Sequence, residues 1–326
     1  MEVNFDSINI KKIILDFPSQ FNTGAEKAKN ISFRKKINRL VFCGMGGSAL
    51  APELLKIYFF HAKINIPVLI WRDYDLPPSI KKEDLIFFIS YSGNTEETIS
   101  GFKKSLNKNL SFLTISSGGQ LYNLSKKYKI PHVLIPAGIP PRFSLGYQIG
   151  AILKILDNSK IISFNFNQEI KINPKKWEKI GQTIALSLKN KIPLIYSSFV
   201  NLPLSFIWKI KFNENSKVPA FCNYFPELNH NEMVGFNQMA EKFFLIILVD
   251  EKEKKEILKR MNLTAKILRK NNIKTRFIKI TGENFLEKIF NNLLLADWAS
   301  YYLAQYYNID PGPVKIVEEF KKLLKK

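Results

Sequence analysis

Cysteine and histidine are scarce in this sequence, whose 326 residues include two cysteines and three histidines. Cys43 and Cys222 are too few for the disulfide framework that stabilises small secreted domains, so we expect a reduced, cytoplasmic protein. The histidines, His61, His132 and His230, lack the mutual spacing of zinc ligands. We therefore expect neither a metal nor another cofactor.

The apolar runs are short. Residues 243–249 form one of the longest, and this run is far below the ~20 residues that a membrane-spanning helix needs. The first ten residues, MEVNFDSINI, also lack the charged and then apolar pattern of a signal peptide. These features predict no membrane association and a cytoplasmic location.

Acidic residues are outnumbered, since 28 Asp and Glu accompany 49 Lys and Arg, for a formal net charge of +21. A charge of this size raises the question of a nucleic-acid partner. The lysines, however, are spread along the chain and are not grouped with glycine and aromatic residues as in RNA-binding motifs. We predict a generally basic surface, the composition expected of an AT-rich genome, and no nucleic-acid partner.

The chain does contain many short apolar segments that alternate with helical patterns. This alternation is typical of parallel sheets covered by helices on both faces, and 326 residues suffice for two cores. We predict an α/β protein with two doubly wound parallel-sheet domains, residues 1–156 and 157–326, joined near the polar stretch 157–174. The expected strands are 40–43, 66–71, 84–90, 111–116, 131–136, 192–198, 219–225, 243–250 and 275–280, and the expected helices include 177–188, 252–269, 285–307 and 314–325.

Two loops in the first half have the composition of an anion site. GMGGS (44–48) and SYSGNT (90–95) each follow a predicted strand and precede a predicted helix, so they can meet in one crevice. Glycines let a backbone approach a ligand, and helix N-termini favour negative charge. The first loop has neither the dinucleotide fingerprint nor the lysine of a Walker loop. We predict phosphate binding by Gly47, Ser48, Ser90, Ser92 and Thr95, with helix capping as the alternative, above all for Thr95.

These two loops, within SYSGNTEET and GMGGSALAPELL, resemble the sugar isomerase (SIS) domain. The signature is Ser-x-Ser-Gly-x-Thr between a strand and a helix. The resemblance implies that the hydroxyl-rich loop holds the phosphate of a sugar phosphate. It leaves the chemistry open, because SIS domains also occur in amidotransferases, epimerases and regulators that sense sugar phosphates.

A stretch in the second half, KFNENSKVPAFCNYFPELNHNEMVGF (211–236), combines one histidine with three acids. Aldose–ketose isomerisation needs a base that moves a proton between adjacent carbons, a group that helps to open the sugar ring, and support for the developing oxyanion. A carboxylate and a histidine suit the first two tasks. The candidates in this stretch are His230, Glu214, Glu227 and Glu232.

This stretch, both loops, PPRFSLGYQIGAIL (140–153) and the tail DPGPVKIVEEFKKLL together resemble the bifunctional phosphoglucose/phosphomannose isomerases, which have two SIS domains. The resemblance implies that Glu214 is the proton-transferring base and that Arg142 lies beside the enediolate. It implies that His230 assists ring opening from the neighbouring subunit of a homodimer. It also implies that a lysine of the C-terminal helix approaches the sugar, and we align that lysine with Lys321.

Other readings stay open from the residues alone. Glu214 could be a surface acid that pairs with Lys211 or Lys217, and either of the two later acids in the stretch could be the base. The expected substrates are glucose 6-phosphate, mannose 6-phosphate and fructose 6-phosphate, interconverted without a metal. The alternative function is a sugar-phosphate sensor without catalysis, which would need the hydroxyl loop but no coupled acid and histidine.

Overall fold

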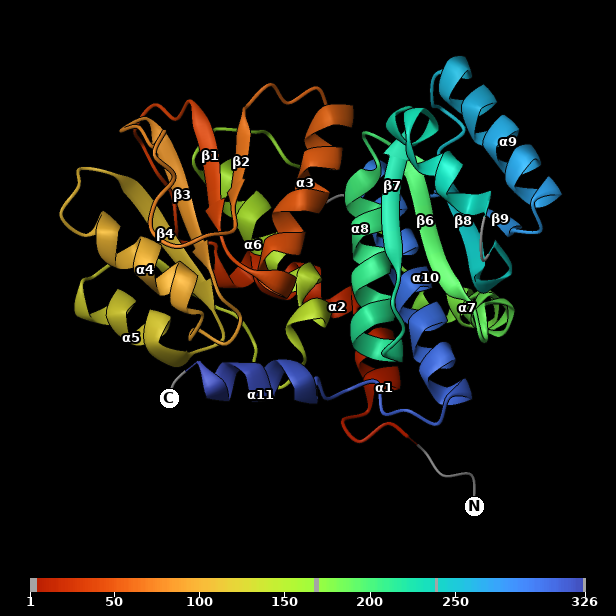
Figure 1. Cartoon of the computed structure of the whole chain (residues 1–326). Helices are drawn as coiled ribbons and strands as arrows, with labels where there is room; N and C mark the ends of the chain where they lie inside the picture. Colours follow the sequence, from red (N-terminus) through yellow and green to blue (C-terminus); the bar gives the residue numbers. More distant parts are fainter. Residues whose placement is uncertain (1–4, 167–169, 238–239, 325–326) are drawn as a thin grey trace. The chain divides into compact units, whose positions relative to one another are not determined.

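The computed structural model describes residues 5–166, 170–237 and 240–324 (Figure 1). Its contacts divide the chain into two compact units. The N-terminal unit comprises residues 16–170, and the C-terminal unit comprises residues 171–326 together with the first fifteen residues. The expected domains are residues 1–156 and 157–326. The first residues join the C-terminal unit because helix α1 (Ile10–Leu15) packs against α7 and α10, and the N-terminal unit extends beyond residue 156 because Phe164 packs on Phe21 and Tyr58.

The N-terminal unit is built on a parallel sheet whose five described strands have the order β2-β1-β3-β4-β5. Every residue of the two strands β3 and β4 is buried, as expected for strands with a helix layer on each face. The strands are β1 (Arg39–Cys43), β2 (Val68–Trp71), β3 (Asp84–Ile89), β4 (Ser111–Ser116) and β5 (His132–Leu134), and the helices are α2 (Pro18–Lys27), α3 (Leu50–His61), α4 (Glu96–Ser105), α5 (Gly119–Lys127) and α6 (Leu145–Asn158).

The C-terminal unit has a second parallel sheet, and its described strands have the order β7-β6-β8-β9. Helix α10 is its longest helix among the described residues and packs against both α7 and α8. The strands are β6 (Ile192–Ser198), β7 (Phe221–Phe225), β8 (Phe243–Val249) and β9 (Lys274–Lys279), and the helices besides α1 are α7 (Pro174–Leu188), α8 (Leu202–Lys211), α9 (Lys255–Lys270), α10 (Phe285–Tyr306) and α11 (Lys315–Leu323).

Both sheets are wound in the same way, which confirms the predicted fold class. In the N-terminal sheet β1 lies between β2 and β3, and in the C-terminal sheet β6 lies between β7 and β8. The chain therefore leaves its first strand in one direction and later crosses to the other side. In sheets of this winding, ligands bind in a crevice at the switch point, which lies at the carboxyl ends of β1 and β3 in one unit and of β6 and β8 in the other.

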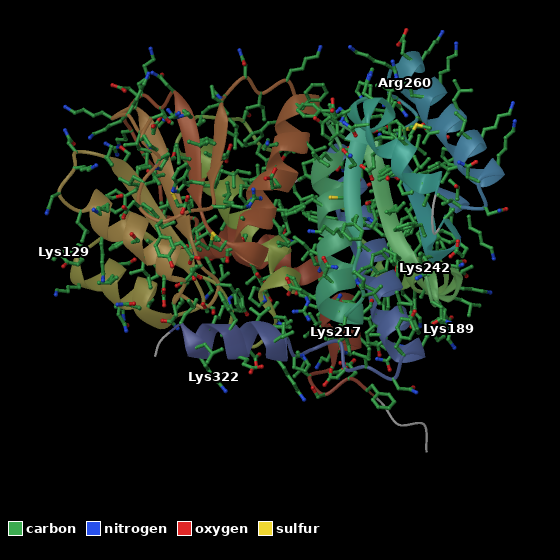
Figure 2. All side chains as sticks on the ribbon, viewed as in Figure 1. Lys129, Lys189, Lys217, Lys242, Arg260 and Lys322 are labelled. Atoms are coloured by element: carbon green, nitrogen blue, oxygen red, sulfur yellow. The ribbon has the colours of Figure 1, made fainter. Side chains whose placement is uncertain are left out.

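The basic residues lie on many different elements. Figure 2 labels Lys129 after α5, Lys189 after α7, Lys242 before β8 and Arg260 on α9, and all four are exposed. Among the residues that the structure describes, no helix is both long and apolar enough to cross a membrane.

Candidate functional site

The structure brings the two predicted anion loops together at the switch point of the N-terminal sheet. The glycine loop becomes a short 3-10 turn, Gly46–Ala49, after β1, and the hydroxyl loop follows β3. The buried Ser48 Oγ accepts a hydrogen bond of 2.9 Å from the backbone N–H of Tyr91. Two loops that are more than forty positions apart in the sequence thus meet at the ends of β1 and β3.

Within the hydroxyl loop, the side chains of Ser90 and Thr95 face each other, with 2.8 Å between their hydroxyl oxygens. Thr95 holds the N-cap position of α4, but its side chain makes no capping hydrogen bond. The exposed Ser92 accepts from the N–H of Asn94 at 3.2 Å. The capping alternative for Thr95 therefore lacks its expected hydrogen bond, and its hydroxyl faces Ser90 at the strand end.

A third loop, which the sequence reasoning missed, supports the hydroxyl loop. Gly93 has a φ of +69°, and a Cβ there would lie 1.8 Å from the carbonyl oxygen of Gly118, so only glycine fits. The Asn94 side chain accepts from the N–H of Gln120 at 3.0 Å. The available signal was Ser116-Ser117-Gly118-Gly119, another run of hydroxyls and glycines between a strand and a helix.

Arg142 lies next to the glycine loop. It is 1% exposed and belongs to the short turn Pro141–Phe143, which packs so closely on Gly47 that a Cβ there would lie 2.9 Å from the Arg142 backbone nitrogen. Tyr91 holds the preceding segment, because its hydroxyl donates to the Pro136 carbonyl at 3.0 Å. One part of the N-terminal unit thus gathers a buried arginine, a glycine turn and several hydroxyls.

This arrangement suits a small anion such as a phosphate. The N-termini of α3 and α4 both start at the crevice, and helix N-termini carry partial positive charge. Cys43 ends β1 immediately before the glycine loop, and burial raises the pKa of its thiol to about 12. The thiol therefore stays protonated, and covalent chemistry through Cys43 is not indicated.

Glu214 belongs to the C-terminal unit, where α8 ends in a π-helical turn, Phe212–Ser216. Such turns are rare in proteins, but the ones that occur are often found at functional sites. The half-buried Glu214 lines a pocket of about 730 Å³, a size that suits a small molecule. The other lining residues are Asn213, Lys217, Val218, Pro219, Ile309, Asp310, Pro313, Val314, Lys315, Ile316 and Val317.

Lys217 connects the two walls of this pocket. It follows the π-helical turn with a φ of +56°. Its ammonium group donates to the carbonyl oxygen of Glu214 and, at 2.7 Å, to that of Pro313. The turn that carries the carboxylate is therefore tied to the segment that leads into α11.

His230 and Lys321 lie elsewhere in the C-terminal unit. His230 ends the short turn Glu227–His230 after β7, is exposed, and is not among the residues that line the Glu214 pocket. Lys321 lies in the last turn of α11 and is also exposed. Lys321, like His230, is not among the residues that line the Glu214 pocket.

The two alternative bases have different surroundings. Glu232 accepts hydrogen bonds from the Tyr196 hydroxyl and the Asn223 amide, and so links β6 to β7. Burial, together with this carboxylate, raises the pKa of the Tyr196 hydroxyl. The exposed Glu227 accepts from the amide of Asn231 at 2.8 Å. Neither glutamate lines the Glu214 pocket.

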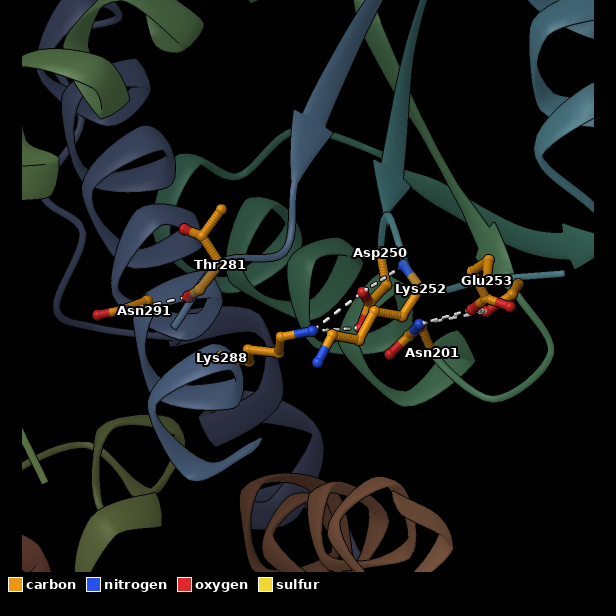
Figure 3. Close-up of polar contacts among 8 residues, drawn as sticks. Asn201, Asp250, Lys252, Glu253, Thr281, Lys288 and Asn291 are labelled. Atoms are coloured by element: carbon orange, nitrogen blue, oxygen red, sulfur yellow. Dashed lines mark hydrogen bonds and ion pairs between the residues drawn. The ribbon is translucent and has the colours of Figure 1, made fainter. Parts of the chain in front are cut away.

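At the switch point of the C-terminal sheet, a closed polar network replaces the anion loops (Figure 3). The Ser198 hydroxyl, at the end of β6, donates to the Glu253 carboxylate, which also accepts from Asn201 Nδ2 at 3.0 Å. Asp250, directly after β8, pairs with Lys288 Nζ at 2.8 Å. Hydroxyl, amide, ammonium and carboxylate groups satisfy one another here, and carboxylates stand where the N-terminal unit has hydroxyls.

Residues that could hold a metal ion are not grouped anywhere in the described ranges, where no cluster of three or more His, Cys, Asp or Glu side chains has suitable geometry. The two candidate regions are thus an anion crevice in the N-terminal unit and a carboxylate pocket in the C-terminal unit.

Comparison with known proteins gives consistent matches. Residues 178–324 match the bacterial phospho-glucose isomerase C-terminal SIS domain. A bifunctional phosphoglucose/phosphomannose isomerase of Aquifex aeolicus is 34% identical, over 97% of this chain and 98% of its own. A protein of the same description from Caldicellulosiruptor bescii is 32% identical, over 95% of this chain and 97% of its own.

Solved structures share the fold at low sequence identity. The C-terminal domain of glucosamine-fructose-6-phosphate aminotransferase from Francisella tularensis superposes with a TM-score of 0.70 at 17% identity, and covers 94% of this chain and 98% of that one. This likeness concerns the fold alone.

Proposed function

The chain belongs to the family of bifunctional phosphoglucose/phosphomannose isomerases, and on that premise we propose that it interconverts glucose 6-phosphate and mannose 6-phosphate with fructose 6-phosphate. The observation that carries the proposal is the near full-length similarity to relatives of that description. With this function go a cytoplasmic location and a role in glycolysis or gluconeogenesis.

The phosphate group binds at the switch point of the N-terminal sheet. Gly47 and Ser48 supply the glycine turn, and Ser90, Ser92 and Thr95 supply hydroxyls. The proposal is supported by the hydrogen bonds that hold these loops together, including the 2.9 Å bond to Ser48 and the 2.8 Å contact of Ser90 with Thr95. Hydroxyls and backbone N–H groups can satisfy the phosphate oxygens without a metal.

Glu214 transfers the proton. The carboxylate takes a proton from C2 of the open-chain aldose and delivers it to C1 through a cis-enediol(ate), and Arg142 stabilises the charge that develops on the oxygens. The half-buried position of Glu214 in a pocket supports its role as base, and the bonds of Glu232 to two neighbouring side chains argue against that alternative. Both epimers reach the same intermediate, because C2 becomes planar in the enediol.

His230 and Lys321 open the sugar ring, with His230 contributed by the second subunit of a homodimer. Its exposure and its absence from the Glu214 pocket support this assignment. Two apolar side chains in the same stretch of the sequence are exposed and would be covered by a second copy: Phe221 on β7 is 51% exposed and Val234 is 73% exposed. Among the described residues β7 pairs with β6 alone, so one edge of this strand has no neighbouring strand.

Solvent exchange tests the proposal. The protein is incubated with fructose 6-phosphate in D2O, and we expect aldose 6-phosphates with deuterium at C2. Coupled assays should detect turnover of glucose 6-phosphate and of mannose 6-phosphate, at rates that a chelator leaves unchanged. Binding of the sugar phosphates without any product would overturn the proposal and favour a sensor.

A further inference from the structure

A buried ion pair lies next to the turn that carries Glu214, at the residue that immediately precedes this turn in the sequence. Lys211, the last residue of α8, pairs with Asp297 of α10, and their side chains are 0% and 3% exposed. Burying two charges costs free energy that their attraction often does not recover, and apolar replacements are frequently as stable. The pair therefore calls for an explanation other than stability.

A second polar contact fixes the same turn from the same helix. Ser300, three residues beyond Asp297 on α10, accepts from Asn215 Nδ2 at 2.8 Å through its hydroxyl and from Ser216 Oγ at 2.7 Å through its carbonyl. Asn215 and Ser216 are fully buried and follow Glu214 directly. Buried contacts thus hold the turn on both sides of the carboxylate in the sequence.

The backbone geometry explains why such contacts are needed. A π-helical turn is a departure from the regular helix, and it positions Glu214 only if its neighbours fix how it is wound. A base must lie within hydrogen-bonding reach of the proton that it moves, and a displacement of about 1 Å can lower the rate by about 10²-fold.

We propose that Lys211, Asp297 and Ser300 are positioning residues for the isomerisation, because they hold the π-helical turn so that the Glu214 carboxylate faces its pocket. The inference rests on the proposed function, and it deepens that function by assigning roles to side chains that do not touch the substrate. The ion pair fixes where α8 ends, and Ser300 fixes the turn that follows.

The main test replaces both charges by apolar side chains of similar size, in the double variant Lys211→Met/Asp297→Leu. We expect kcat for fructose 6-phosphate formation to fall by about 10²-fold, with KM within about 3-fold of the wild type, since the phosphate loops lie in the other unit. The melting temperature is measured in parallel, and it should change little, because a buried ion pair is often replaceable.

A matched control lies on the same helix α10, where Asn291 accepts from the indole N–H of Trp177 of α7 at 3.1 Å. Trp177→Phe/Asn291→Leu also removes both partners of a polar contact of α10. We expect its kcat to stay within about 3-fold of the wild type, because this contact joins α10 to α7 and not to the π-helical turn. An equal loss of kcat in this control would show a general effect of the helix interface and would overturn the proposal.

Ser300 gives an independent test that leaves the charges in place. Ser300→Ala removes the acceptor of Asn215 and should lower kcat by about 10-fold, whereas Ser300→Thr keeps the hydroxyl and should restore it. Equal kcat values for the two variants would overturn the proposal, even if the double variant did not fold. An inactive wild-type protein would instead contradict the proposed function, so the two failures are distinguishable.

Discussion

The switch points of the two sheets occupy the same place in the same winding, yet their side chains suit opposite tasks. In the N-terminal unit the strand ends lead into glycines and hydroxyls, with Ser48, Ser90 and Thr95 around the crevice. In the C-terminal unit the strand ends lead into Ser198, which donates to Glu253, and Asp250, which pairs with Lys288 (Figure 3).

This difference separates what a fold provides from what residues provide. Parallel winding gives both units a switch point at the carboxyl ends of the strands, where ligands bind in many open α/β sheets. In the C-terminal unit, carboxylates stand where the N-terminal unit has hydroxyls, and they accept from the neighbouring donors. The C-terminal unit places Glu214, the proposed base, elsewhere, in the π-helical turn that follows α8. Family resemblance between domains therefore does not predict that both crevices bind ligand.

The largest expected effect tests where the chemistry of the C-terminal unit lies. Glu214→Gln should lower kcat by about 10²–10⁴-fold, because an amide cannot accept the proton, while substrate affinity stays nearly unchanged. Steady-state kinetics with fructose 6-phosphate and a direct binding assay measure the two effects separately.

Glu253→Gln is the matched control, since it makes the same chemical change at the C-terminal switch point. Its amide oxygen can still accept the hydrogen bonds of Ser198 and Asn201, so we expect kcat close to that of the wild type. If Glu253→Gln were inactive and Glu214→Gln active, the assignment of the two regions would be reversed.

The next effect concerns the stability of the ion pair at the C-terminal switch point. Asp250→Asn leaves the ammonium group of Lys288 without its carboxylate, and the side chains of this pair are 4% and 13% exposed. Breaking a buried pair in this way should lower the free energy of unfolding by about 3–5 kcal/mol. Urea unfolding measures the change. Asp250→Leu/Lys288→Met, which removes both charges, should recover most of the loss, and no recovery would speak against the ion pair as the cause.

A smaller effect, on sugar-phosphate affinity, is expected at the N-terminal switch point. Ser92→Ala/Thr95→Ala removes two hydroxyls from the proposed phosphate site and should weaken sugar-phosphate binding by about 10²-fold, because a hydrogen bond to a charged group contributes about 1.5–3 kcal/mol. Calorimetry with glucose 6-phosphate measures the affinity. Ser198→Ala, at the other switch point, should leave the affinity unchanged, and equal losses at both sites would remove the distinction between them.

Much of the fold was predictable, because continuous apolar strands give a direct signal. The expected strands 111–116 and 192–198 match β4 and β6 to the residue, and the helix expected at 285–307 matches α10 within one residue. Alternation of strands and helices also gave the parallel sheets. A continuous apolar run indicates a strand that is buried on both faces, and a parallel sheet covered by helices on both sides buries its strands in this way.

The sequence did not predict α8 or the π-helical turn after it. Apolar residues occur around most of α8, so its pattern lacks a clear polar face, and Pro203 near its start weakens the helical signal. The turn depends on contacts with Asp297 and Ser300, which lie more than eighty residues away. Local patterns cannot report such contacts, and for the same reason Glu214 could not be told from a surface acid without the family resemblance.

The smallest expected effect is on the pH dependence of stability, and it arises at the edge of the N-terminal sheet. His132, on β5, has its Nδ1 at 2.6 Å from Thr114 Oγ1, and burial lowers the pKa of its imidazole to about 4. In the unfolded chain the imidazole titrates near pH 6.5, so between pH 6.5 and 4 the unfolded state binds a proton that the folded state excludes. Stability should fall as the pH decreases through this window.

His132→Asn removes this proton linkage while an amide still faces Thr114. Between pH 7 and pH 4, its free energy of unfolding should change by about 1–2 kcal/mol less than that of the wild type. This value is smaller than the full pKa shift would give, because the side chain is only partly buried. Urea unfolding at several pH values measures the free energy of unfolding of both proteins. In the difference between them, the contribution of the carboxylates that both proteins share cancels. Parallel pH profiles would mean that His132 does not contribute, and that the acid sensitivity of the N-terminal unit arises from its carboxylates alone.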